Sequence, residues 1–319
     1  MFLEPVPGET AGRVRAMATD ITVRALVPGD RPAERLWPVL QLFSEVEAEC
    51  TRFVATSPLM RANASPQQWH RVPQRCFDAL VEADRAYQST AGRFDPRVLS
   101  DLVRLGYDRS LPFAAGAPVL AGPRPRRRRP LGPWRPRFRG GSSEVCLGPH
   151  PVDLGGIGKG LAVRWASQML RPLAPDHLIE AGGDCYCSGR APGGGPWLVA
   201  VEDPSGGEAP VAVLSLSDRA CTTSSLRLRR WRLGGEAVHH LVDPRDGSPG
   251  GSGLLAVTVV GADPAVAEVW SKVIFLAGYR EAPRVAARKG LAALWVGADG
   301  SLGISPAMGR YVTWRADSA

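Results

Sequence analysis

Residues 152–160 read VDLGGIGKG and lead directly into a helix predicted over residues 158–170. Glycine has no Cβ atom, so backbone amides in this stretch can approach an anion, and a helix N-terminus adds about half a positive charge. The glycine spacing matches neither the P-loop nor the Rossmann signature. Taken alone, the segment is compatible with a phosphate-binding turn and equally with a plain strand-to-helix turn.

The patterns on both sides of this segment predict an α+β fold. Helices are expected over residues 32–50, 72–90, 264–277 and 280–289. Strands are expected over residues 17–27, 177–181, 184–188, 197–202, 210–216, 219–224, 238–242, 254–260 and 292–296. Because several strands follow one another without an intervening helix, we expect a mainly antiparallel sheet with helices packed on one side.

The composition is that of a globular protein with a basic excess. The 319 residues are 44% hydrophobic and 22% charged, with a formal net charge of +8. No apolar run reaches the roughly 18 residues of a membrane-spanning helix. Residues 1–20 lack the apolar core of a secretory signal peptide, so a cytoplasmic location and reduced cysteines are expected. Only one residue separates Cys185 from Cys187, which is not a zinc-site spacing.

Residues 110–143 differ from the rest of the chain. They contain eight arginines and no other charged residue, and eleven glycines and prolines fall between positions 116 and 141. Such a segment cannot bury enough apolar surface to offset its ordering entropy, so we predict a mobile loop. The basic and acidic residues elsewhere balance, so the net charge belongs to this segment. No nucleic-acid-binding motif accompanies it, and no nucleic-acid partner is expected.

Four further segments carry polar groups that are compatible with a site. They are EAGGD at 180–184, TTSS at 222–225, HHLVDPRDG at 239–247, and Glu268 followed one helical turn later by Lys272. Singly, each is more typical of a turn, a strand cap, a structural histidine or a surface ion pair.

The order of these segments resembles the ApbE family of FAD:protein FMN transferases. Upstream, MAT at 17–19, TRF at 51–53, SPL at 57–59 and GRFDP at 92–96 are similar to further family motifs. The resemblance covers residues 17–300 and implies an ApbE-like, T-fold-like domain over 17–310. Residues 1–16 are then an N-terminal extension, and residues 110–143 interrupt the domain.

The resemblance implies an enzyme that moves the FMN half of FAD onto a Thr or Ser hydroxyl of a target flavoprotein. The product is a phosphoester, AMP is released, and Mg²⁺ assists. Two alternatives stay open: a divergent member that binds FAD without transfer, and one that hydrolyses FAD to FMN and AMP.

The resemblance also implies site residues. The catalytic positions are His240, Asp184 and Lys159. The flavin-nucleotide positions are Met17, Phe94, Asp95, Gly155, Leu161, Ser224 and Leu241. The metal positions are the Gly158 carbonyl, Glu268 and Lys272.

Lys272 stands where the family has a metal-ligating Thr, and a charged ammonium has no lone pair for a metal. Two outcomes follow. A shifted metal is held by Glu268 and Gly158, or Lys272 is itself a fixed cation against the pyrophosphate.

Overall fold

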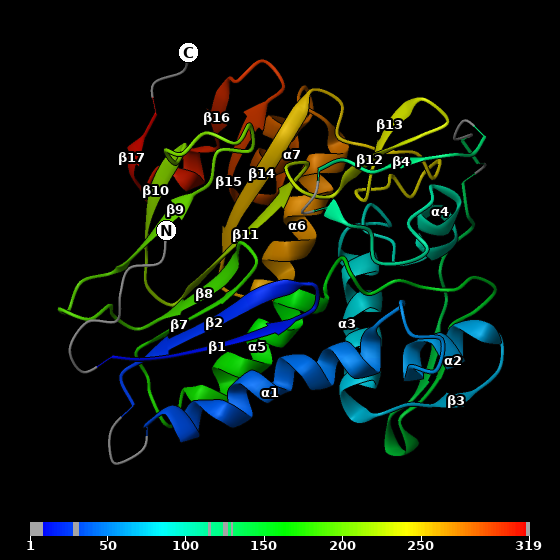
Figure 1. Cartoon of the computed structure of the whole chain (residues 1–319), viewed down its shortest axis with the longest axis horizontal. Coiled ribbons are helices and arrows are strands. Elements are labelled where there is room, and N and C mark those ends of the chain that lie inside the picture. The colour runs from blue at the N-terminus through cyan, green and yellow to red at the C-terminus, as the bar shows by residue number, and fades with distance from the viewer. Residues whose placement is uncertain (1–8, 28–31, 114–115, 124–126, 129, 317–319) are drawn as a thin grey trace.

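The structure is a computed structural model that describes residues 9–27, 32–113, 116–123, 127–128 and 130–316. Its centre is an eight-stranded sheet (Figure 1) whose neighbouring strands are all antiparallel. In spatial order the strands are β1 (Thr10–Ala16), β2 (Thr19–Ala25), β7 (His177–Ala181), β8 (Asp184–Ser188), β11 (Arg219–Ser225), β14 (Leu254–Gly261), β15 (Ala292–Gly297) and β16 (Leu302–Ile304). The predicted α+β class and antiparallel sheet are confirmed.

Helices cover one face of the large sheet. The helix α1 (Pro32–Cys50) packs on β1 and on α5 (Gly158–Leu170), while α5 and α6 (Pro264–Ala277) pack on each other and on the central strands. Outside them lie α7 (Ala282–Lys289), α2 (Pro58–Ala64), α3 (Gln74–Ser89) and α4 (Leu99–Arg104). Asp263 begins α6 as its N-cap, because its side chain accepts from the Val266 amide at 3.0 Å.

A second, three-stranded sheet covers the opposite face. It contains β9 (Trp197–Val201), β10 (Ala212–Leu216) and β17 (Val312–Arg315). Successive residues of the central strands serve opposite cores: Val259 joins the helix-side core, and Val260 joins the core beneath β10 together with η3 (Pro306–Met308). Because β17 pairs with β10, the folded unit extends to residue 315, and the boundary predicted at residue 310 is wrong.

The N-terminal boundary and the first strand also need correction. Residues 10–16, expected in an extension, form β1 and pair along their whole length with β2. The strand expected over 17–27 is β2, the second strand of a hairpin that turns at Met17 and Ala18, whose φ angles are 53° and 58°. Neither residue type signals a left-handed turn, which costs about 1–2 kcal/mol per non-glycine residue. Residues 1–8 lie outside the described residues.

The described parts of the arginine-rich segment make defined contacts with the rest of the chain, which its composition does not predict. Trp134 is 1% exposed, and its indole nitrogen donates to the Leu147 carbonyl at 2.9 Å. The Arg128 side chain donates to Asp101 at 2.9 Å, and its amide donates to the Asp246 carbonyl at 2.7 Å. Arg128 therefore has a buried acceptor, Asp101, outside the segment, which the absence of acidic residues within the segment conceals.

Two small sheets incorporate parts of the same segment. One contains β13 (Glu236–His239), β12 (Arg230–Leu233) and β4 (Val119–Leu120). The other contains β3 (His70–Arg71), β6 (Glu144–Cys146) and β5 (Arg137–Arg139), with η2 (Gly140–Ser142) between β5 and β6. The strand expected over 238–242 is β13 and ends at His239, before the turn at Asp243 and Pro244. Among the described helices, none is both long and apolar enough to cross a membrane.

Gly160 sets the distance between α5 and α6. A Cβ atom at this position would lie 2.6 Å from the Ala265 Cα atom and 2.6 Å from the Pro264 carbonyl oxygen. Both neighbours are backbone atoms at the start of α6, so they cannot rotate away. The glycine is therefore needed for helix packing, a role that the anion-binding interpretation of VDLGGIGKG does not include.

We predict that Gly160→Ala lowers the free energy of unfolding by about 2 kcal/mol, because the added methyl group must push the two helices apart. Urea denaturation followed by circular dichroism measures the change. Gly195→Ala is the matched control, since a Cβ there meets no atom within 4 Å. Equal stability of the two variants would contradict the close helix contact.

Candidate functional site

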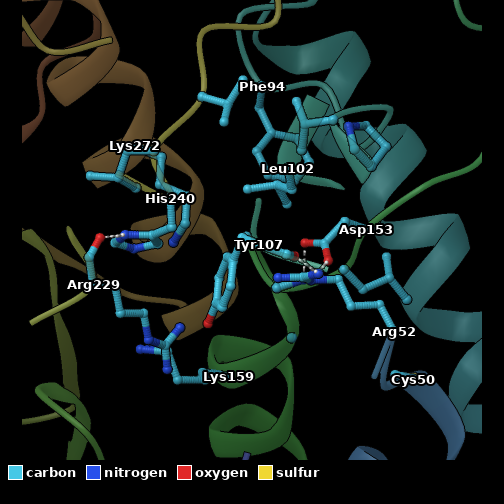
Figure 2. A pocket seen from close by; sticks show the side chains of 18 of the residues that line it. Cys50, Arg52, Phe94, Leu102, Tyr107, Asp153, Lys159, Arg229, His240 and Lys272 are labelled. Carbon is cyan, nitrogen blue, oxygen red and sulfur yellow. Dashed lines mark hydrogen bonds and ion pairs between the residues drawn. The ribbon is translucent and has the colours of Figure 1, made fainter. Parts of the chain in front are cut away.

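A cleft opens where the N-terminal end of α5 meets α6, the tip of the β1–β2 hairpin and the segment that follows α1. Figure 2 shows Lys272, His240, Arg229 and Lys159 along one side of it, and Arg52, Asp153 and Cys50 along the other. Its larger apolar lining residues are Met17, Val46, Phe53, Phe94, Val98, Leu102, Tyr107, Leu154, Leu241, Val242 and Leu276. Its charged lining residues are Glu47, Arg52, Arg93, Asp95, Asp153, Lys159, Arg229 and Lys272.

Arg52 and Asp153 form a buried ion pair at the edge of the cleft. The Arg52 Nε atom lies 3.0 Å from Asp153 Oδ2, and the guanidinium lies 4.1 Å from the Phe53 ring centre and 4.3 Å from that of Tyr107. The other Asp153 oxygen accepts from the Gly155 amide at 2.8 Å. Both carboxylate oxygens are engaged, so Asp153 fixes the shape of the glycine turn.

Most amides of the glycine turn already have partners inside the protein. Besides Gly155, the amides of Ile157 and Gly158 donate to the Leu154 carbonyl at 3.1 and 2.8 Å. The Gly160 amide donates to Glu268 Oε2 at 2.8 Å. Gly156 leaves room for two side chains to pack against the turn. A Cβ atom at this position would lie 2.9 Å from the Phe94 ring and 3.5 Å from the Lys272 stem. The main effect of the glycines is therefore to let neighbouring side chains pack closely against the turn, and most of the backbone amides are not free to bind a ligand.

Lys159 extends into the cleft from the first turn of α5 and is held from below by Asp184. The Lys159 ammonium donates to Asp184 Oδ2, and Asp184 Oδ1 accepts from the Thr223 amide at 3.0 Å. Asp184 is 1% exposed and does not line the cleft. The contact fixes the position of a cation at the cleft wall.

Glu268 and Lys272 form a second buried pair one turn apart on α6. Lys272 Nζ lies 3.0 Å from Glu268 Oε1, and Glu268 is fully buried with its other oxygen on the Gly160 amide. No group of three or more His, Cys, Asp or Glu side chains suited to a metal occurs in the described part of the chain. Because each Glu268 oxygen already accepts a hydrogen bond and the Lys272 ammonium has no lone pair, these two residues do not form a Mg²⁺ site.

His240 is half-buried beside these cations. Its Nδ1 atom lies 3.2 Å from the Arg229 carbonyl oxygen. A carbonyl only accepts, so Nδ1 carries the hydrogen and Nε2 keeps its lone pair. Burial, and then the charge of Arg229, holds the pKa of His240 well below its ordinary value of 6.5. The imidazole is therefore neutral near pH 7 and able to accept a proton.

The structure brings together most of the residues that the sequence singled out. The residues that line the cleft are Met17, Phe94, Asp95, Gly155, Gly158, Lys159, His240, Leu241 and Lys272. Those that lie beneath it, buried, are Leu161, Asp184, Ser224 and Glu268. Among these, Ser224 Oγ shares a 2.8 Å hydrogen bond with Ser271, whose hydroxyl donates to the Glu268 carbonyl at 2.9 Å. In this structure the side chains of these four residues are buried and contact other protein groups, so their predicted roles in catalysis, nucleotide binding and metal binding stay predictions.

Sequence reasoning missed several lining residues. Asp95, a predicted flavin-nucleotide position, lines the cleft, and Arg97, which the sequence did not single out, binds it at 2.6 Å. Tyr107, Leu102 and Arg229 were not singled out, because each comes from a segment without a recognisable motif. Only their place in the folded chain brings them to the cleft.

The family model of ApbE matches residues 17–295. The chain belongs to the ApbE family. This confirms the resemblance that the ordered motifs indicated. The FAD:protein FMN transferase of Salmonella typhimurium is 28% identical over 151 residues, which cover 47% of this chain and 43% of the relative. That of Rhodobacter capsulatus is 32% identical over 159 residues, covering 49% of this chain and 30% of the relative. The match thus spans less than half the length of these curated relatives.

Solved structures agree with the ApbE fold over nearly the whole chain. The ApbE protein of Thermotoga maritima has a TM-score of 0.80 and 23% identity, and the match covers 95% of this chain and 99% of that one. The apo flavinyl transferase ApbE of Pseudomonas stutzeri has a TM-score of 0.80 and 21% identity, with 97% and 98% coverage. At these identities the comparison establishes the fold.

The burial of His239, the neighbour of His240, makes the stability of the protein depend on pH. Burial lowers its pKa to about 4, while its unfolded value is about 6.5. Below pH 6.5 the unfolded chain binds a proton that the folded chain refuses, so stability falls as the pH drops towards 4. We predict that His239 contributes a loss of up to about 1.4 kcal/mol per pH unit in this window.

Urea unfolding of the wild type and His239→Gln, at pH 7.5 and at pH 5, measures this contribution. In the wild type the Leu241 amide donates a hydrogen bond to His239 Nδ1 at 3.3 Å, and glutamine retains an acceptor for this amide. The difference at pH 7.5 gives the packing effect alone, and the variant should lose less stability on acidification. Parallel pH profiles would show that His239 titrates normally.

Proposed function

We propose that this ApbE protein transfers the FMN moiety of FAD to a Thr or Ser hydroxyl of an acceptor flavoprotein. The observation that carries the proposal is one cleft that joins an apolar wall, several cations and a neutral histidine beside the glycine turn. A flavin dinucleotide combines a flat apolar ring with a doubly charged pyrophosphate, and this lining complements both parts. The names of the curated relatives agree with it.

The flavin ring is proposed to bind on the side of Phe94, Leu102 and Tyr107. Phe94 is held in place because it packs over Gly156, where no Cβ intervenes. The Arg52 guanidinium borders this region, and its Nη2 atom is buried without a hydrogen-bond partner among the described residues. A buried unsatisfied donor is costly, so a polar edge of a bound ligand would stabilise it.

The pyrophosphate is proposed to bind on the opposite side, near Lys159 and Arg229. The acceptor hydroxyl oxygen attacks the FMN-side phosphorus, forms the new phosphoester bond and breaks the bond to the AMP phosphate. His240 Nε2 takes the hydroxyl proton, and AMP leaves with the bridging oxygen. Negative charge grows on the leaving phosphate, and fixed cations stabilise it without reorganisation.

The supporting residues have positioning roles in this proposal. Asp184 holds Lys159 at the wall, while Ser224 and Leu161 support the helices that carry the site. Mg²⁺, which the resemblance implies, has no fitting ligand set in the described residues, and no step is assigned to it. The cytoplasmic location stays a prediction from sequence.

We predict that His240→Ala lowers the rate of FMN transfer about 10²- to 10⁴-fold and leaves FAD affinity nearly unchanged, because proton transfer is needed only in the reaction. AMP release and the mass of a co-expressed candidate acceptor flavoprotein measure transfer. Quenching of flavin fluorescence measures binding.

His150→Ala is the matched control, because His150 does not line the cleft. An unchanged rate in His240→Ala would refute the role of this histidine. AMP formed at the same rate without an acceptor would favour FAD hydrolysis, and bound FAD without AMP under any condition would favour a binding protein.

A further inference from the structure

Lys272 extends from α6 to the wall of the cleft. Its side chain lines the cleft and is 16% exposed. The stem is close to the glycine turn, 3.5 and 3.6 Å from where a Cβ of Gly156 would lie. The Lys272 side chain therefore lies at the wall of the cleft, beside the glycine turn and close to His240.

Glu268 fixes the ammonium and prevents a metal from taking its place. One of its oxygens accepts from the Gly160 amide at 2.8 Å and the other from Lys272 at 3.0 Å. A divalent metal beside Oε1 would lie next to the Lys272 ammonium, and the repulsion between the two cations opposes a metal at this fully buried carboxylate. An ammonium has three donors, and Glu268 uses one, so the others are available to phosphate oxygens.

The surrounding charges favour an anion at this point. Two of the carboxylates that line the cleft are paired with basic residues, Asp153 with Arg52 and Asp95 with Arg97, and Glu47 is the third acidic lining residue. The buried Asp184 beneath the cleft is paired with Lys159. Among the described residues, Arg229 makes no ion pair. The positive charge of Lys272 also contributes to the lowered pKa of His240, in agreement with their proximity.

We propose that the Lys272 ammonium binds the pyrophosphate of the ligand directly and replaces a divalent metal, so that this chain binds and processes its dinucleotide without Mg²⁺. The inference rests on the proposed function for the identity of the ligand. The bonds that form and break are those already described, and Lys272 supplies charge without exchanging atoms. Its fixed position means that the positive charge does not depend on metal concentration.

Two probes separate this inference from the proposed function. FAD binding is followed by flavin fluorescence, and ADP, which has the diphosphate but no flavin, is titrated by calorimetry. Each is measured in EDTA and in millimolar Mg²⁺. We expect the wild type to bind each probe equally well in both buffers and to transfer FMN in EDTA.

The decisive variant combines Lys272→Met with Glu268→Gln. The pair loses both charges together, so no unpaired buried charge remains, and the amide oxygen of the new glutamine side chain can still accept from the Gly160 amide. We expect about a tenfold or greater loss of affinity for both probes in both buffers, as for a lost charge-assisted hydrogen bond. Lys289→Met, at an exposed lysine on α7, is the matched control and should bind like the wild type. Thermal unfolding checks that each variant is folded.

Wild-type binding or transfer that requires Mg²⁺ would overturn the inference, as would wild-type affinity in a folded double variant. If both probes depend on Lys272 as expected but no FMN is transferred, the proposed function fails while the assignment of Lys272 stands.

Discussion

The buried carboxylate of Glu268 joins the two helices on which the cleft depends. It accepts from the first turn of α5 through Gly160 and from Lys272 on its own helix, so it fixes the helix crossing and the position of a cation together. A buried ionised group is unfavourable unless it is fully paired, and both oxygens here are paired. The same crossing needs Gly160 to have no side chain. One contact thus links helix packing to the chemistry of the site.

Sequence patterns predict the bounds of the helices and strands of this fold better than they predict which elements pair with one another. The bounds of α1, α5 and α6 agree with their apolar periodicity and with the Pro and Gly residues at their ends. The β1–β2 hairpin was missed because its turn is formed by Met17 and Ala18, which do not signal a turn. Its left-handed backbone is imposed by the strand pairing on either side, a tertiary effect that local residue type does not encode.

The same difference between local segments and distant contacts applies to the candidate site. The ordered motifs led to most of the residues that line the cleft, because each motif is a short local segment. They did not distinguish side chains that line it from those that support it, since this depends on partners distant in sequence. The contact between Glu268 and Gly160 spans 108 residues, and it changes the interpretation of both. The arginine-rich segment is similar: its composition suggested disorder, while Trp134 and Arg128 find partners elsewhere in the chain.

The origin of the cleft lining has a consequence for folding. Its walls come from residues near positions 17, 52, 94, 153, 240 and 272, which span most of the chain. No short contiguous fragment contains both walls, so the site exists only when elements distant in sequence have assembled. A ligand that binds there is linked by mass action to the complete fold rather than to one element. Occupancy of the cleft is thus a measure of how much of the chain has reached its native arrangement.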